Sequence, residues 1–200
     1  LIYTLALVII GDFASFFVHW LMHKIPVLWE FHKIHHSATT LNPFTQYRLH
    51  PVEIILNNAK AILIIGLITG FFDYFSNNLL SKHTIIGVNI FNFLFLVFGA
   101  NLRHSHVPFK YFNFLEYFLI SPYQHQIHHS NNPADFDKNM GAKLAIWDSL
   151  FGTLKRSEEV TSVQFGLGLG DDKNYDTLGK NLWMPFRNTY KKLIYLVKKI

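Results

Sequence analysis

Histidine is the residue type whose spacing in this sequence points most directly to chemistry. The chain contains 12 histidines and no cysteine, so a site for a soft metal ion would have to use nitrogen ligands. Most of the histidines occur in short groups: one pair is spaced as H-x-x-x-H, and the pattern H-x-x-H-H occurs twice. The groups are His19 and His23; His32, His35 and His36; His104 and His106; and His125, His128 and His129.

This spacing suits ligands that are carried on helices. Residues three and four apart lie on one face of a helix, and the three positions of H-x-x-H-H fall within about 100° of arc. Three imidazoles can therefore converge from a single helix, and two such triplets plus a pair could surround two adjacent ions. Burying so many imidazoles without partners would cost several kcal/mol, which favours metal binding over a purely structural role.

The number of histidines narrows the choice of metal chemistry. All-nitrogen sites suit zinc, iron, copper or nickel, and the H-E-x-x-H motif of zinc proteases is absent. The pair and the two triplets supply more ligands than one zinc ion takes, so two ions are expected. Two redox-active ions beside apolar helices predict O2 activation and attack on an unactivated C–H bond.

Two isolated histidines have simpler interpretations. His83 is expected at the surface or in a helix cap. His50 precedes Pro51 in the motif R-L-H-P-V-E, and a local structural role and a functional one are equally open.

Composition and hydropathy indicate a membrane protein. Half of the 200 residues are hydrophobic, 20 are Phe, and the mean hydropathy is +0.18. Charged residues make up 16%, against roughly 25% in an average soluble domain. Apolar helices are expected at residues 1–18, 52–72 and 84–100, the last two forming a hairpin, and residues 111–119 are expected to form an amphipathic helix at the membrane interface.

The chain is expected to form one unit. Residues 1–156 would form the catalytic part, and residues 157–200 a polar loop and basic tail of the same unit. The sequence begins inside an apolar run without a Met, so we expect a preceding segment to be missing and no signal peptide to be present.

The formal net charge of +5 fits a membrane surface better than nucleic acid, for which no motif is present. Four lysines near the C-terminus could attract an acidic electron carrier or anionic lipid. These are Lys191, Lys192, Lys198 and Lys199.

The ordered motifs resemble those of one known family. Asp12 and the first histidine pair are followed by L-W-E-F-H-K-I-H-H-S at residues 28–37 and R-x-H-P-x-E at residues 48–53. N-L-R-H-S-H at residues 101–106, S-P-Y-Q-H-Q-I-H-H-S at residues 121–130 and a closing block at residues 138–154 complete the set. Together they resemble the fatty acid hydroxylase/sterol desaturase superfamily of membrane-bound, histidine-box di-iron oxygenases, and the match covers residues 12–154.

This resemblance implies an all-α fold, with multi-pass membrane helices beneath a helical cytosolic cap that holds a dinuclear metal site, and with the C-terminal tail on the cytoplasmic side. It implies two iron ions, for which zinc may substitute in purified material, O2 as co-substrate, a lipid substrate and an external electron-donor protein. His106 is a ligand, a second-layer residue or neither. Asp12, seven residues before His19, could orient that imidazole, and a plain structural role for Asp12 is equally open. The implied ligands are His19, His23, His32, His35, His36, His104, His125, His128 and His129.

The resemblance also covers positions outside the ligand set. Trp147 and Asp148 match a block that we interpret as structural support. Trp20 departs from the family, since relatives often have Arg there, and this departure affects only local surface contacts.

Several activities are compatible with this sequence. Hydroxylation of a sterol, fatty acyl or related lipid is the leading prediction, and desaturation within the same superfamily is its alternative. Carotenoid hydroxylation and ether-lipid cleavage stay open. Outside this class, a non-catalytic zinc-binding membrane protein would explain the histidines but would not require the other matched blocks. A metal transporter would carry its ligands inside the spans, whereas the triplets lie in polar stretches between the expected spans.

Overall fold

The computed structural model describes residues 2–77, 95, 99–168 and 170–198. Within these residues the secondary structure is helical, with two isolated β-bridges and no strand, so the predicted all-α fold is confirmed for this part of the chain. The elements are α1 (Ile2–Lys24), α2 (Pro26–His36), η1 (Pro43–Tyr47), α3 (Pro51–Phe75), α5 (Asn101–Arg103), η3 (Leu115–Tyr117), α6 (Pro122–His128), η4 (Pro133–Asp135), α7 (Ile146–Phe151), η5 (Ser157–Glu159), η6 (Asp171–Tyr175) and α8 (Leu178–Val197).

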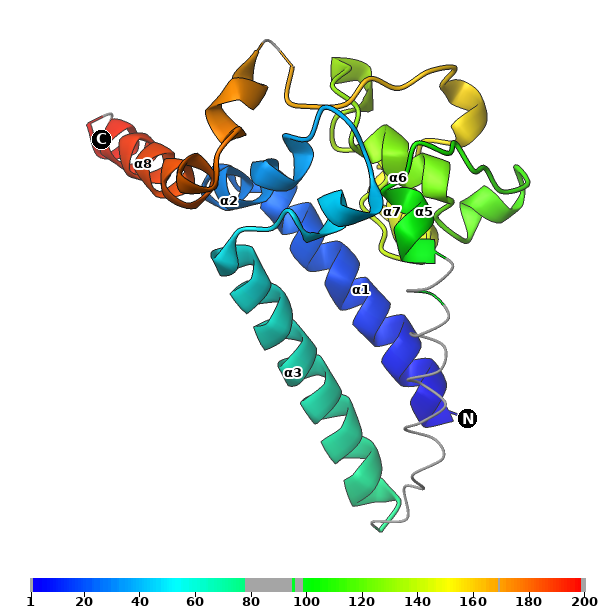
Figure 1. Cartoon of the computed structure of the whole chain (residues 1–200). Helices are drawn as coiled ribbons and strands as arrows, with labels where there is room; N and C mark the ends of the chain where they lie inside the picture. The colour runs from blue at the N-terminus through cyan, green and yellow to red at the C-terminus, as the bar shows by residue number, and fades with distance from the viewer. Residues whose placement is uncertain (1, 78–94, 96–98, 169, 199–200) are drawn as a thin grey trace.

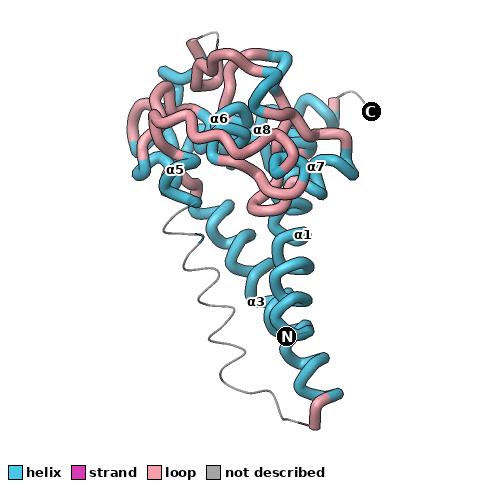
Figure 2. The backbone as a smooth tube through the Cα atoms, turned by 90° about the vertical axis from the view of Figure 1, so that its right-hand side faces the viewer, coloured by secondary structure: helices cyan, strands magenta, loops and turns pink. Residues whose placement is uncertain are grey.

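Two long helices, α1 and α3, extend from a head of short helices and loops (Figures 1 and 2). They run antiparallel, and the Tyr3 hydroxyl lies 2.9 Å from the Thr69 hydroxyl near the end remote from the head. With 23 and 25 residues, both are long and apolar enough to cross a bilayer. Their apolar side chains are largely exposed, Ile62 to 74%, which suits contact with lipid rather than a role as soluble core helices.

The expected elements agree with the structure in part. The helix expected at residues 52–72 is α3, whereas the one expected at residues 1–18 extends to Lys24 and carries the first histidine pair on its last turns. Most of the expected helix at residues 84–100, and His83, lie outside the described residues.

The interfacial helix expected at residues 111–119 was a wrong prediction, because only η3 forms there. Glu116 is fully buried, and its carboxylate accepts hydrogen bonds from the Ser121 hydroxyl at 2.8 Å and from the Ser157 amide at 2.8 Å. A helix lying on the surface could not bury this carboxylate, so the segment folds as a loop around it.

Prolines and capping side chains fix where the histidine-bearing helices and α3 begin. Pro26 and Pro122 occupy the first positions of α2 and α6, where a missing N–H costs nothing. Ser121 and Gln124 form a capping box that starts α6. His50 caps α3: its Nδ1 accepts from the Val52 amide at 3.1 Å, and its Nε2 donates to the Leu182 carbonyl at 3.1 Å. The structure thus gives His50 a local structural role.

The closing block supports the head as predicted. The Asp148 carboxylate is fully buried and accepts from the amides of Met140 at 2.7 Å and Gly141 at 2.8 Å, and from the Thr153 hydroxyl at 2.5 Å. A Cβ at Gly141 would lie 2.7 Å from the Leu144 carbonyl oxygen, so this close backbone approach requires glycine. These contacts hold the loop before α7 against α7 itself.

Candidate metal centre

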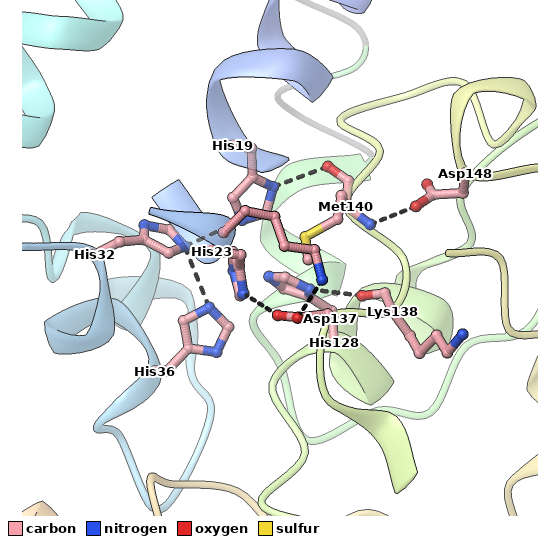
Figure 3. A network of polar contacts seen from close by, with 10 residues as sticks. His19, His23, His32, His36, His128, Asp137, Lys138, Met140 and Asp148 are labelled. Atoms are coloured by element: carbon pink, nitrogen blue, oxygen red, sulfur yellow. Dashed lines mark hydrogen bonds and ion pairs between the residues drawn. The ribbon is translucent and has the colours of Figure 1, made fainter. Parts of the chain in front are cut away.

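The nine histidines predicted as ligands converge in the head in two groups. The potential ligand atoms of each group all lie within 4.8 Å of one another. We call them the first and second histidine sites. The first contains His19, His23, His32, His36 and His128 (Figure 3). The second contains His35, His104, His125 and His129. His106 is exposed and belongs to neither site.

Each H-x-x-H-H triplet is divided between the two sites. On α2 the outer pair, His32 and His36, belongs to the first site and His35 to the second, whereas α6 contributes only His128 to the first site. Positions i and i+4 are separated by about 40° around a helix, and i+3 lies to one side of both. The triplet therefore presents two imidazoles to one centre and one to its neighbour. The rings of His36 and His129 stack with centroids 4.4 Å apart, so the two sites adjoin.

Backbone carbonyls orient two rings of the first site. His19 Nδ1 lies 2.8 Å from the Met140 carbonyl oxygen, and His128 Nδ1 lies 2.8 Å from that of Lys138 (Figure 3). A carbonyl can only accept, so each Nδ1 carries the proton. The Nε2 atoms then present lone pairs, which is the form that binds a metal.

Carboxylates orient two more rings of this site. His32 Nδ1 lies 2.9 Å from Glu53 Oε1, deep inside the protein, and His23 Nδ1 lies 3.3 Å from Asp137 Oδ1, nearer the surface. In the second site, His104 Nδ1 pairs with the Thr45 hydroxyl at 3.1 Å. Partners of this kind fix the tautomer and raise the basicity of a ligand.

The inward-facing nitrogens test whether these residues fit a metal. His19 Nε2 and His32 Nε2 lie 3.1 Å apart, although both rings have committed their Nδ1 protons elsewhere. Two facing lone pairs repel each other, and a cation between them would convert the repulsion into two bonds. The Nε2 atoms of His23 and His128 are buried and have no hydrogen-bond partner, which is costly in the absence of a cation. The residues therefore fit a metal.

Burial favours the neutral form of four of these imidazoles. It lowers the pKa of His104 to about 4 and that of His128 to about 3. Burial, followed by repulsion from neighbouring histidines, also lowers the pKa values of His36 and His129 well below the usual range. At neutral pH the head thus offers uncharged nitrogen donors, which suit iron, zinc, copper or nickel.

The contact expected between Asp12 and His19 is absent from the described interactions. Asp12 Oδ2 instead accepts from the Leu144 amide at 3.0 Å and from Trp147 Nε1 at 3.1 Å, while the Met140 carbonyl orients His19. Asp12 therefore ties α1 to the loop before α7.

Sequence reasoning missed five groups that orient ligands: the carboxylates of Glu53 and Asp137, the Thr45 hydroxyl and the carbonyls of Lys138 and Met140. Glu53 lies within the R-x-H-P-x-E element and could have been found as the carboxylate of that element. No pattern marks Asp137, and backbone carbonyls leave no trace in a sequence.

A cavity of about 350 Å³ opens beside the first site. His23, His36 and His128 line it together with Trp29 and Asp137. The first site is thus accessible from the loops of the head.

Two adjoining histidine sites that could hold metal ions, at the end of two membrane-length helices, place the chain in the class of proteins with histidine-rich candidate metal sites. The chain belongs to the fatty acid hydroxylase family, whose model matches residues 4–153. The superfamily predicted from the histidine motifs is thereby confirmed.

Curated relatives have related names. Over 78% of the present chain, the sequence is 28% identical to alkylglycerol monooxygenase of Homo sapiens and 29% identical to that of Danio rerio. It is 26% identical to the ornithine lipid hydroxylase OlsE of Rhizobium tropici over 80% of its length. The chain spans 31% of the two monooxygenases and 44% of the hydroxylase. These names support the predicted enzyme class, a hydroxylase-type oxidoreductase. No solved structure matches the chain.

Proposed function

We propose that this chain forms the catalytic part of an O2-dependent membrane hydroxylase that acts on a lipid-like substrate, a sterol, fatty acyl chain or related molecule. The observation that carries the proposal is the pair of adjoining sites in which nine imidazoles gather with inward-facing nitrogens. Two iron ions bound there would supply O2 activation for attack on a C–H bond. Desaturation of the same class of substrate is the alternative that this site also supports.

The chain's own residues would hold and aim the ligands. Glu53 and the carbonyls of Lys138 and Met140 fix three rings with their Nε2 atoms inward. The surrounding helices bury the second site, which limits the access of water. No haem, flavin or nicotinamide motif is present in the sequence, so electrons would come from an external donor protein.

The distribution of basic residues supports a cytoplasmic head. Three basic residues lie near the head ends of the two long helices. Lys24 ends α1, Lys33 follows in α2, and Arg48 precedes α3. The described residues at the opposite ends of both helices include no Lys or Arg. Basic residues close to membrane helices favour the cytoplasmic side. We therefore propose that α1 and α3 span the membrane, within a multi-pass protein, with the head and C-terminal tail in the cytoplasm.

The C-terminal helix α8 suits a membrane surface. It carries a stripe of exposed apolar side chains within about 80° of arc, and Arg187, Lys191 and Lys198 border this stripe on one side. His50, at the head end of α3, binds the Leu182 carbonyl, so α8 is attached where α3 would enter the bilayer. The stripe consists of Trp183, Phe186, Tyr190, Leu193 and Val197.

We expect α8 to lie in the interface with this stripe in the acyl region. Because the chain has no cysteine, Tyr190→Cys and Lys191→Cys each create a single labelling site on adjacent residues. In anionic liposomes, a polarity-sensitive label at position 190 should emit at shorter wavelength and resist iodide quenching, and the label at position 191 should do neither. Equal quenching of both labels would contradict this placement. It would favour the alternative that the basic tail binds an acidic protein partner.

The proposed activity is tested on detergent-purified chain expressed with added iron. We expect about two metal ions per chain, since nine histidines exceed the four ligands of one tetrahedral site. We also expect the reduced protein to consume O2 faster when lipid is added, with the product gaining one oxygen atom. A product that has instead lost two hydrogens would identify a desaturase. Two bound ions without lipid-dependent O2 uptake would favour the zinc-binding alternative, and near-zero metal would overturn the proposal.

A further inference from the structure

Polar side chains form facing stripes on the two membrane-length helices. Both stripes begin at the metal centre and lead away from the head, at spacings that keep one helical face. Lys60 Nζ bridges them by donating to Ser15 Oγ at 3.1 Å and to Asn57 Oδ1 at 3.2 Å. The stripes consist of Asp12, Ser15 and His19 on α1, and Glu53, Asn57 and Lys60 on α3.

A cavity of about 210 Å³ lies between these stripes and the head. Its lining includes His19 and His32 of the first site as well as His35 and His125 of the second, so it adjoins both metal sites. A molecule that entered between α1 and α3 would reach the metals through this cavity. Its volume suits a headgroup and a few methylene groups, and the rest of an acyl chain would extend along the helices.

The charged lining of the cavity is mainly cationic. It contains Lys60, Arg103 and one carboxylate, Glu53, whose Oε1 is committed to His32. Among the described residues, no carboxylate lies within ion-pair distance of Lys60 or Arg103. Asp12 attracts both only at longer range, and its Oδ2 is occupied by Leu144 and Trp147.

Both cations occupy positions where charge is costly. Arg103 is only 7% exposed, and its described contacts are the Phe95 ring and a 3.5 Å hydrogen bond to the Ile120 carbonyl. Lys60 lies nine residues after the start of α3, roughly 13 Å along the helix axis, which is far from either end of the membrane-length segment. A charge at such depth usually marks a binding site or a pathway. A cationic lining opposes the passage of metal ions, so a pathway for metals is disfavoured.

We propose that this cavity binds the anionic headgroup of the substrate, a carboxylate or a phosphate, between Lys60 and Arg103, so that the oxidised carbon lies within a few bonds of that headgroup. The proposal rests on the proposed lipid hydroxylase function and names its substrate class. Arg103 offers a planar fork of donors that matches either anion, and Lys60 adds a point charge.

The test compares binding of three probes that share one saturated chain: palmitate, hexadecyl phosphate and hexadecanol. Each competes with labelled palmitate for the iron-loaded chain in neutral detergent. We expect at least one anionic probe to bind about tenfold more tightly than hexadecanol, and the relative strength of palmitate and hexadecyl phosphate identifies the headgroup. Equal binding of all three probes would overturn the proposal.

Lys60→Met keeps the length of the side chain and removes its charge, so the anionic preference should fall to about twofold or less. Lys173→Met, at an exposed position outside the cavity, should retain the full preference. Metal content is measured on each variant to verify that the head is intact. If Lys60→Met retains the full anionic preference, Lys60 does not bind the headgroup and the proposed site is wrong.

Binding is measured here without turnover. If the unmodified chain shows lipid-dependent O2 uptake but binds all three probes equally, this inference alone is refuted. A headgroup preference without any O2 uptake would refute the proposed hydroxylase and not the anion site.

Discussion

A His104→Ala variant will bind about half of the metal held by the unmodified chain, whereas His106→Ala will bind all of it. The two residues are separated by one serine, and the sequence motif alone makes both of them candidates. His104 is buried, and its Nε2 lies 3.1 Å from His125 Nε2 in the second histidine site. His106 is exposed and lies in neither site. Removing His104 leaves three histidines at the second site and leaves the first site unchanged.

Metal per chain, measured by elemental analysis after purification, checks this expectation. Lipid-dependent O2 uptake should fall about a hundredfold or more in His104→Ala, since removing a ligand should cost at least as much as the 10–100-fold typical of a second-layer partner. His36→Ala leaves four histidines at the first site, which are enough for one tetrahedral ion, so its metal loss should be smaller than that of His104→Ala. Full metal content in His104→Ala, or equal metal losses in His104→Ala and His106→Ala, would contradict the assignment of His104 to the second site.

The ligand set could be predicted from the sequence because its information is local. Residues at i, i+3 and i+4 share a helical face wherever that helix is placed, so the triplets at His32 and His125 mark α2 and α6 as ligand-bearing helices. The division of each triplet between two sites could not be predicted in this way. It depends on how α1, α2 and α6 cross, and this is decided by long-range contacts such as that between Asp12 and Trp147.

The contacts that orient the ligands were harder to predict from the sequence. The Met140 carbonyl orients His19 from 121 residues away in sequence, and a backbone carbonyl has the same identity in every residue. The loop at residues 111–119 illustrates the same limit. Its aromatic and polar alternation favoured an interfacial helix, but burial of the Glu116 carboxylate against the nearby Ser121 and the distant Ser157 overrides that local preference.

Glu53→Ala is expected to lower metal affinity at the first site by about 10–100-fold, the usual effect of removing a carboxylate that holds a ligand histidine. Glu53 is 4% exposed, and its Oε1 lies 2.9 Å from His32 Nδ1. The carboxylate fixes the Nδ1–H tautomer and makes Nε2 a stronger donor. Glu53→Gln retains an oxygen that can accept the same hydrogen bond but removes the charge, so its affinity should lie between those of Glu53→Ala and the unmodified chain.

Asp137→Asn is the matched control on the same site. Asp137 also faces a ligand, His23, but its oxygen is 3.3 Å from Nδ1, its side chain is 38% exposed, and Lys24 shares the carboxylate. Water screens an exposed charge of this kind, so the affinity should change by less than about threefold. Competition with a graded series of chelators measures both variants on the iron-loaded chain. If ligand orientation by buried charge governs this centre, only the Glu53 variants will release iron to weaker chelators. Equal release from Asp137→Asn would show that burial of the carboxylate does not decide its effect, and no release from any variant would show that the imidazoles hold the metals without help from their outer partners.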